Sequence, residues 1–385
     1  MSSPIASSKG YGKYRLPTSV VPLTYDLHLY PNISDGFFKG NVLMHLKVQM
    51  KTNEIVMHCN NLDIAKTLIN GELSWFDVDD SSYELLTIKM KNGADFLEGS
   101  DVNVTIYFNG NLENKIVGLY KSQYVAENST TRNIVTSQLE ATHAREVFPC
   151  FDEPNFKTTF KVHLLKPKDP SYSALSNFPE IREEDASDGI MVHFAETVPM
   201  STYLACFIIS DFKYTKRSFD NNDGTMVPFR FYATPAQINK TIFAGEFGKE
   251  VMEHYIRYFN VSFPLPKLGK YFFGGKVTQD NVKSSDMVAI PDFQSGGMEN
   301  WGLVTFREAV LLYDVAIHSE ETKQTVAVTV AHELSHSWFG NLVTMKWWDD
   351  TWLNKGFATY ISFKGIEKYA PEWKIVLFSL IPYQK

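Results

Sequence analysis

Apolar and polar residues alternate along much of the first half of the chain. In the segments 41–50 (NVLMHLKVQM) and 101–108 (DVNVTIYF), apolar residues recur at every second position. A period of two is typical of strands that bury one face, and it favours an antiparallel sheet with one solvated side. Segments 24–30 (TYDLHLY) and 160–165 (FKVHLL) repeat this alternation, with turn-rich pieces between them. The pattern predicts a large antiparallel β-saddle or sandwich that runs to about residue 215.

The pattern changes after the polar stretch 216–225 (KRSFDNNDGT). In segment 241–259, apolar residues recur at three- and four-residue spacing, which predicts an amphipathic helix packed against a core. The residues of this stripe are Phe243, Phe247, Val251, Tyr255 and Tyr258. A length of 385 residues also exceeds what one core usually serves. We therefore predict a β + α multidomain protein, with a β-domain at 1–215 and an α + β domain at 216–385.

A second helix is predicted over residues 320–339. Ser319 is a suitable N-cap, and Gly340 suits the C-terminal end. The helix carries an apolar stripe made by Val326, Val330, Leu334 and Trp338. His332 and His336 are four residues apart, so they share a face roughly 200° around the helix from this stripe. The two imidazoles should therefore point together, away from the core.

The arrangement His-Glu-x-x-His on a helix is the motif of zinc-dependent peptidases. His332 and His336 would bind the metal, and Glu333 could take a proton from a metal-bound water without binding the metal itself. The alternative is a helix with two solvated histidines. The capped ends and the apolar stripe favour a metal site.

Composition narrows the classes of partner. The formal net charge is −7 without a long run of Lys or Arg, which argues against nucleic acid as a partner. Apolar residues make up 44% of the sequence, enough for packed cores. The cysteines Cys59, Cys150 and Cys206 are odd in number and widely spaced, so they fit neither a disulfide framework nor a Cys-x-x-Cys metal site. We expect them to be small buried residues.

Targeting signals point in two directions. The N-terminal sequence has no apolar signal segment, and no stretch reaches the ~18 apolar residues that span a bilayer. A cytoplasmic protein with no membrane segment is therefore expected. Five Asn-x-Ser/Thr sequons favour the alternative, a secretory or extracellular protein. They begin at Asn32, Asn103, Asn128, Asn239 and Asn260.

Several motifs together resemble one family. The segment GGMEN at 296–300 precedes HELSH at 332–336, which continues as SWFGNLVTMKWWDDTWLN. With QLEATHAREVFPCFDEPNFKTTF at 138–160 and VPLTYDLHLYPN at 21–32, these segments resemble the gluzincin zinc aminopeptidases, which include aminopeptidase N and puromycin-sensitive aminopeptidase. The resemblance implies an N-terminal β-saddle and a thermolysin-like α + β catalytic domain. It also implies one Zn²⁺ per chain and removal of single residues from peptide N-termini.

The resemblance assigns roles to individual residues. His332 and His336 would be zinc ligands, and Glu333 would be the general base. In the family, the Glu of the Gly-Ala-Met-Glu-Asn motif binds the substrate's free α-amine, a position that Glu299 holds here. The rest of this substrate-binding motif is Gly296, Gly297, Met298 and Asn300, with Gly297 in place of the usual Ala.

A second carboxylate is implied at the same amine. Glu140 matches an acidic residue that the family's β-saddle contributes, and Gln138 lies beside it in the substrate-binding set. Carboxylates placed one residue's length from the metal would recognise an ammonium and reject internal peptide. The alternative for Glu299 and Glu140 is an ordinary structural salt bridge.

One residue departs from the family in the metal site. The third zinc ligand of the family is a Glu nineteen positions after the second His, and Lys355 stands there. An ammonium has no lone pair and repels a cation, so we expect weak zinc binding. Asp349 and Asp350 precede the second helix of the motif and should point elsewhere.

The resemblance also implies an incomplete catalytic domain. The family's oxyanion-stabilising tyrosine belongs beyond residue 385, and Tyr360 and Tyr383 are not at its position. A further departure is the segment 269–285, whose deletion would join Leu268 to Asp286 in family-like sequence. We expect it to be a surface insertion or a translated intron.

Three functions stay open from the sequence. The first is a zinc aminopeptidase of doubtful activity, which acts on a peptide with a free N-terminus. The second is an inactive module that binds peptide N-termini through Glu299 and Glu140. The third is a structural or non-functional fragment.

Overall fold

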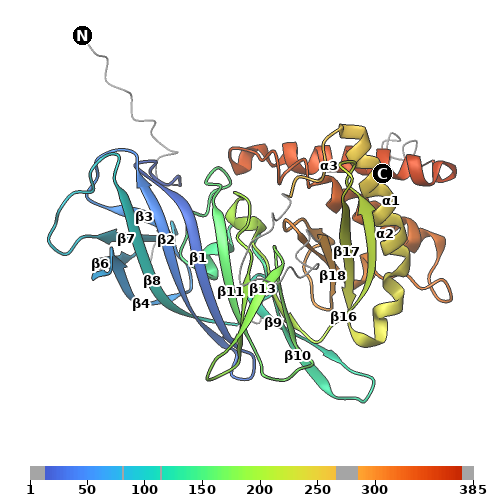
Figure 1. The fold of residues 1–385 in the computed structure, drawn as a ribbon, viewed down its shortest axis with the longest axis horizontal. Helices are drawn as coiled ribbons and strands as arrows, with labels where there is room; N and C mark the ends of the chain where they lie inside the picture. Colours follow the sequence, from blue (N-terminus) through green and yellow to red (C-terminus); the bar gives the residue numbers. More distant parts are fainter. Residues whose placement is uncertain (1–13, 80–81, 113–114, 266–284, 375–385) are drawn as a thin grey trace, which may run out of the picture.

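The computed structural model of the protein describes residues 14–79, 82–112, 115–265 and 285–374. Figure 1 shows a strand-rich part, coloured blue to green, beside a part in which helices α1, α2 and α3 lie against a smaller sheet. The predicted class, an antiparallel β-domain followed by a partial α + β domain, is confirmed.

The largest sheet has eight strands and forms the body of the strand-rich part. In spatial order its strands are β13 (Glu180–Asp185), β14 (Ile190–Phe194), β11 (Thr159–Lys166), β1 (Val20–Asn32), β2 (Phe37–Val48), β8 (Asp101–Asn111), β4 (Asp63–Ile69) and β5 (Glu72–Leu73). Neighbours are antiparallel except β1 and β11, which run parallel. Burial alternates along β2 as predicted, with Val42 and Met44 fully buried. Met50, the last apolar residue of segment 41–50, lies beyond β2 and is 53% exposed.

Two smaller sheets complete this part. One contains β12 (Ser173–Ser176), β15 (Phe207–Ser210), β10 (Thr131–Gln138) and β9 (Gly118–Val125), and the other contains β3 (Ile55–His58), β7 (Leu85–Lys89) and β6 (Trp75–Val78). All three cysteines are buried and unpaired, as expected.

The second part is built on a five-stranded sheet. Its strands, in spatial order, are β16 (Lys213–Asp220), β17 (Met226–Ala233), β18 (Ser285–Ile290), β20 (Leu303–Arg307) and β19 (Gly297–Met298). The helices are α1 (Ile242–Phe259), α2 (Glu320–Ser335) and α3 (Thr351–Tyr369). Short 3₁₀ helices occupy Ala144–Glu146, Thr202–Leu204, Pro235–Thr241, Glu308–Val310, Trp348–Asp350 and Pro371–Trp373. Among the described residues, no helix is both long and apolar enough to cross a membrane.

The polar stretch 216–225 is part of a hairpin. Residues 216–220 continue β16, which pairs with β17, and the turn follows. Phe219 is fully buried within this stretch and packs edge-on against Phe229 and Phe263. The predicted division at residue 215 therefore falls inside β16, while the chain changes sheets between β15 and β16. The division into two units stays a prediction.

The helices follow their sequence patterns closely. Ser319 Oγ accepts a hydrogen bond from the Thr322 backbone N–H, so the predicted N-cap is confirmed. Helix α2 ends at Ser335, four residues before the predicted end at 339, because the chain turns and Gly340 takes a φ of +120°. In α1 the stripe residue Tyr258 is 52% exposed, whereas the others are buried or partly buried. The proposed insertion at 269–285 lies outside the described residues except for Ser285, the first residue of β18.

Tyr255 of α1 ties the three helices together. Its hydroxyl donates to the carbonyl oxygens of Ala331 on α2 and Ile361 on α3, both at 3.1 Å. Its ring is fully buried. Since α2 carries the two histidines and α3 carries Lys355, this contact fixes the spacing of the helices that form the site.

Replacing Tyr255 by Phe should lower the free energy of unfolding by about 1 kcal/mol, because it removes a buried donor shared by two carbonyls. Urea unfolding should show a lower midpoint at an unchanged slope. Tyr258→Phe is the matched control on the same helix, and we expect a change within about 0.5 kcal/mol for this exposed position. Equal midpoints for the two variants would contradict this role of Tyr255.

Candidate functional site

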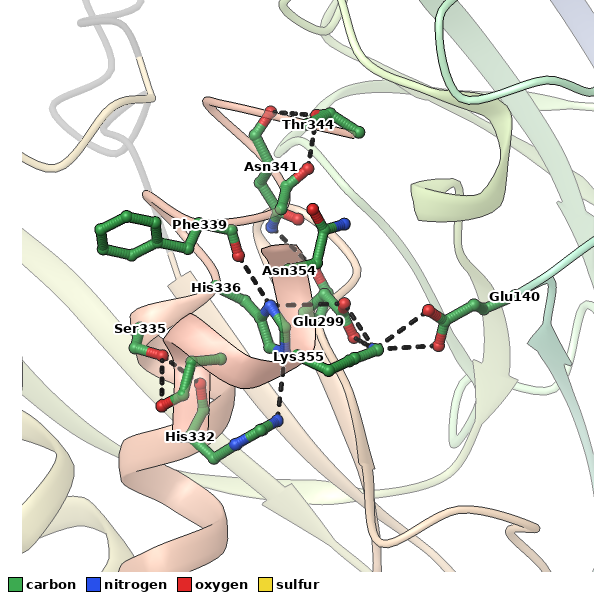
Figure 2. A network of polar contacts seen from close by, with 12 residues as sticks. Glu140, Glu299, His332, Ser335, His336, Phe339, Asn341, Thr344, Asn354 and Lys355 are labelled. Carbon is green, nitrogen blue, oxygen red and sulfur yellow. Dashed lines mark hydrogen bonds and ion pairs between the residues drawn. The ribbon is translucent and has the colours of Figure 1, made fainter. Parts of the chain in front are cut away.

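His332 of α2 and His336, the residue that follows α2, face one another. His332 Nε2 and His336 Nε2 are 3.2 Å apart, and His336 is fully buried (Figure 2). Burial lowers the pKa of His332 to about 3 and that of His336 to about 4, so both imidazoles are neutral at pH 7. His336 Nδ1 donates to the Phe339 carbonyl at 2.8 Å, which leaves a lone pair on its Nε2. The predicted pairing of the imidazoles is therefore present in the structure.

Lys355 lies one turn into α3 and reaches two carboxylates. Its ammonium is 2.7 and 2.9 Å from the oxygens of Glu299, which is 1% exposed. It is also 3.0 Å from each oxygen of Glu140. Figure 2 shows the Lys355 side chain running from the helix to a point between these two glutamates. The residue that replaces the third ligand thus fills the predicted amine site.

The charges of this group depend on one another. Burial alone would raise the pKa of Glu299, but His336, which is charged only below about pH 4, and the Lys355 ammonium outweigh it and lower that pKa to about 2. Burial and the charge of Glu299 raise the pKa of Glu140 to about 7. Burial works against the charge of Lys355, yet Glu299 and Glu140 prevail and raise its pKa. Lys355 is therefore an ammonium at pH 7.

This donor set does not fit the zinc site of the family. His332 and His336 offer two lone pairs, whereas a catalytic zinc takes three protein ligands and keeps one position open. The third position carries a protonated lysine. A second group of possible ligands consists of one atom each from Glu299, Glu333 and His336, which lie within 4.8 Å of one another. Both oxygens of Glu299 already bind Lys355, so this group does not offer a metal a free set of ligands. Among the described residues, no metal-binding group contains Asp349 or Asp350.

Glu333 points from α2 toward the strand β19. A Cβ at Gly297 would lie 2.6 Å from Glu333 Cδ, so only glycine allows this approach. Burial and the charge of Glu299 raise the pKa of Glu333 well above its usual range. Its Oε2 is buried without a hydrogen-bond partner among the described residues. Glu333 can therefore take this position only because residue 297 is Gly and not the Ala that is usual in the family.

The remaining motif residues hold Glu299 in place. Met298 is fully buried in β19, the edge strand of the five-stranded sheet, where it pairs with Thr305. Asn300 donates to Thr305 Oγ1 at 3.0 Å. Asn341 Nδ2 donates to the Glu299 carbonyl at 2.8 Å. Gly296 anchors the start of this segment through its carbonyl, which accepts from the Arg307 backbone N–H.

The strand-rich part contributes to the site from the end of β10 and from the segment between β10 and β11. Gln138 ends β10, and its Oε1 is buried without a hydrogen-bond partner among the described residues. Two residues later, Glu140 meets Lys355. Lys157, which the sequence did not single out, donates to the carbonyls of Asn341 and Leu342. It fixes the turn after α2, and its isolated positive charge gave no sequence signal for this role.

Two tyrosines, Tyr360 and Tyr383, were compared with the oxyanion-stabilising tyrosine that the resemblance implies. Tyr360 lies on α3 and is 56% exposed. Tyr383 lies outside the described residues. The roles of all these site residues in binding or catalysis stay predictions.

Paired imidazoles and a carboxylate on one helix, set beside a sheet edge with an acidic residue, define the class as a gluzincin-type peptidase fold. Two family models match the chain: the Peptidase M1 N-terminal domain over residues 21–204 and the Peptidase family M1 domain over residues 243–383. The chain belongs to peptidase family M1. Aminopeptidases of this family are zinc-dependent in general.

Similar curated proteins are named aminopeptidases. Endoplasmic reticulum aminopeptidase 1 of Rattus norvegicus is 37% identical, over 97% of this chain and 39% of the relative. Aminopeptidase M1-D of Oryza sativa subsp. japonica is 37% identical, over 96% of this chain and 40% of the relative. Glutamyl aminopeptidase of Homo sapiens is 35% identical, over 97% and 38%. The chain thus spans about two fifths of the length of these relatives.

Replacing Lys355 by Gln should destabilise the protein, because it leaves two adjacent carboxylates without their cation. Loss of one partner of a fully buried ion pair costs ~3–5 kcal/mol. We expect about 2–3 kcal/mol here, since the Lys355 side chain is 35% exposed and solvent screens part of the effect. Lys364→Gln on the same helix is the control: its exposed pair with Glu367 should contribute less than about 1 kcal/mol.

The loss should also depend on pH. In the native chain the lowered pKa of Glu299 stabilises the fold above about pH 4.5, and this contribution disappears as the pH falls toward about 2. Without Lys355, burial should raise that pKa instead, so the variant gains relative stability as Glu299 is protonated. Chemical unfolding at pH 7 and near pH 4 should therefore show a smaller difference at the lower pH. A pH-independent difference would contradict the ion pair as its cause.

Proposed function

We propose that this chain is a non-hydrolysing member of the M1 aminopeptidases, in which its own Lys355 closes the site for a substrate amine. The contact that carries this proposal is the ammonium of Lys355 between Glu299 and Glu140, at 2.7–3.0 Å from four carboxylate oxygens. A substrate α-ammonium would need the same oxygens. The chain therefore holds an internal cation at the position where its resemblance to the family implies the N-terminus of a peptide substrate.

The metal chemistry supports the same proposal. Zinc in such peptidases polarises the scissile carbonyl and activates a water. His332 and His336 could supply two ligands, but the raised pKa of Lys355 keeps a positive charge at the third position. We therefore derive no hydrolytic step for this chain.

A second candidate function is binding of peptide N-termini without cleavage. Two observations favour it: β19 is an edge strand that could pair with an extended peptide, and Lys355 is partly exposed. The peptide's ammonium would then have to displace Lys355 from Glu299. This competition predicts weak binding by the native chain.

The cellular location stays a prediction. The five Asn-x-Ser/Thr sequons favour a secretory compartment. One relative carries the endoplasmic reticulum in its name.

Zinc should not bind stably between His332 and His336 in the native chain. After equilibration with zinc and dialysis against a mild chelator, we expect the native protein and His336→Asn to retain the same amount of metal. Lys355→Glu should gain about one equivalent, because it completes a His₂Glu set, and His336→Asn in that background should remove it. The native chain should not hydrolyse an aminoacyl chromogenic amide. Hydrolysis that Glu333→Gln abolishes would contradict the proposal.

Removing the internal cation should open the amine site. Lys355→Ala should bind a short peptide with a free N-terminus more tightly than its acetylated form, by ~10-fold or more, the scale of one charge-assisted hydrogen bond of about 1.5–3 kcal/mol. Adding Glu299→Gln should remove most of this preference. Calorimetry on folded variants measures both. If the native chain already shows the full preference, Lys355 does not occupy the site in solution.

A further inference from the structure

Three histidines lie in a row across the eight-stranded sheet. His28 on β1 is the register partner of His163 on the parallel strand β11, and His163 is the partner of His193 on β14. Register partners on adjacent strands place their side chains on the same face. The rings of His28 and His163 stack at a centroid distance of 4.1 Å, and those of His163 and His193 lie 4.6 Å apart. His28 lies in the family-like segment 21–32, but the resemblance assigns no role to any of the three histidines.

A carboxylate completes the group. Asp26 lies two residues before His28 on β1, so both side chains share one face. Asp26 Oδ1 is 3.1 Å from His28 Nε2 and 3.1 Å from His163 Nε2. This oxygen is buried and lies at ion-pair distance from both rings, although neither contact has the full geometry of a hydrogen bond. Two imidazole nitrogens thus converge on one carboxylate oxygen.

These donors have the spacing of ligands around a small cation. One donor atom from each of Asp26, His28 and His163 lies within 4.8 Å of the other two. Tetrahedral zinc, with ligand distances of ~2.0–2.2 Å, places its ligand atoms about 3.4 Å apart. The two nitrogen–oxygen distances of 3.1 Å differ from this by a few tenths of an ångström. Small ring movements would therefore accommodate an ion.

The outer contacts favour a lone pair on His163 Nε2. His163 Nδ1 is 2.5 Å from His193 Nδ1, and His193 Nε2 is 3.4 Å from Glu184 on β13. If His163 Nδ1–H donates to His193, the proton of His193 lies on Nε2, which is at ion-pair distance from Glu184 but makes no hydrogen bond among the described residues. Arg182 Nη2, 3.5 Å from His193 Nδ1, also suits an acceptor there. A second hydrogen-bond partner on the other ring nitrogen, as His193 provides for His163, is typical of metal-binding histidines.

We propose that Asp26, His28 and His163 form a binding site for a divalent transition-metal ion of the Zn²⁺ class on this face of the large sheet. Imidazole with one carboxylate suits Zn²⁺ better than Mg²⁺ or Ca²⁺, which prefer oxygen ligands. The side chains are 30%, 30% and 15% exposed, so an ion can enter from solvent and keep a water as a further ligand. The ion joins β1 to β11, strands that are far apart in the sequence (Figure 1).

Zinc titration of the full chain tests this site. Calorimetry near pH 7.5 should show about one equivalent of Zn²⁺ bound by the native protein, with no competition from excess Mg²⁺. His28→Asn and His163→Asn should each weaken binding at least ~100-fold, since each removes a ligand. Zn²⁺ should raise the Tm of the native protein by a few degrees, and these two variants should lose that shift.

Two controls separate this site from other histidines. His45→Asn changes an exposed histidine on the neighbouring strand β2, and His336→Asn changes the buried pair on α2. Both should bind Zn²⁺ like the native protein. All variants are first compared by circular dichroism and Tm without metal, which shows that they fold. Absence of zinc binding by the native chain would overturn the proposal. Binding by His28→Asn and His163→Asn that is as tight as binding by the native chain would also overturn it. So would loss of the zinc in His336→Asn.

Discussion

The site depends on the ion pair between the buried carboxylate of Glu299 and the ammonium of Lys355. Glu299 is 1% exposed at the edge of the five-stranded sheet, and an isolated anion there would be strongly disfavoured. Lys355 satisfies it from α3 and at the same time satisfies Glu140, which comes from the strand-rich part. A single ammonium therefore connects three segments of the chain. The resemblance places a substrate's N-terminus at these same carboxylates, so the lysine acts chemically as a built-in version of that ligand.

The same substitution determines the metal chemistry. Burial keeps His332 and His336 neutral, as metal ligands need to be, but the third position supplies charge of the wrong sign. Glu333 turns toward Gly297, a contact that an alanine would prevent. Two departures from the family pattern, Lys355 and Gly297, therefore act on neighbouring side chains. The β-domain and part of the α + β domain are present, while Lys355 changes the charge at the centre of the site.

Local patterns predicted the elements better than the contacts between them. The alternation in β2, the N-cap at Ser319 and the pairing of His332 with His336 all depend on residues within a few positions of one another. The ion pair of Lys355 joins residues 56 and 215 positions apart, so spacing alone could not show it. The charge pattern held a usable signal, because two carboxylates implied at an ammonium site would attract any lysine beside them. The row of His28, His163 and His193 depends on strand register, which the sequence does not specify.

A crystal structure of the native protein soaked in zinc, with anomalous data at the zinc edge, tests the central claim most directly. The account predicts Lys355 Nζ within hydrogen-bonding distance of Glu299 and Glu140, and no anomalous peak between His332 and His336. A strong peak bound by both imidazoles, with the Lys355 side chain turned away from Glu299, would contradict it.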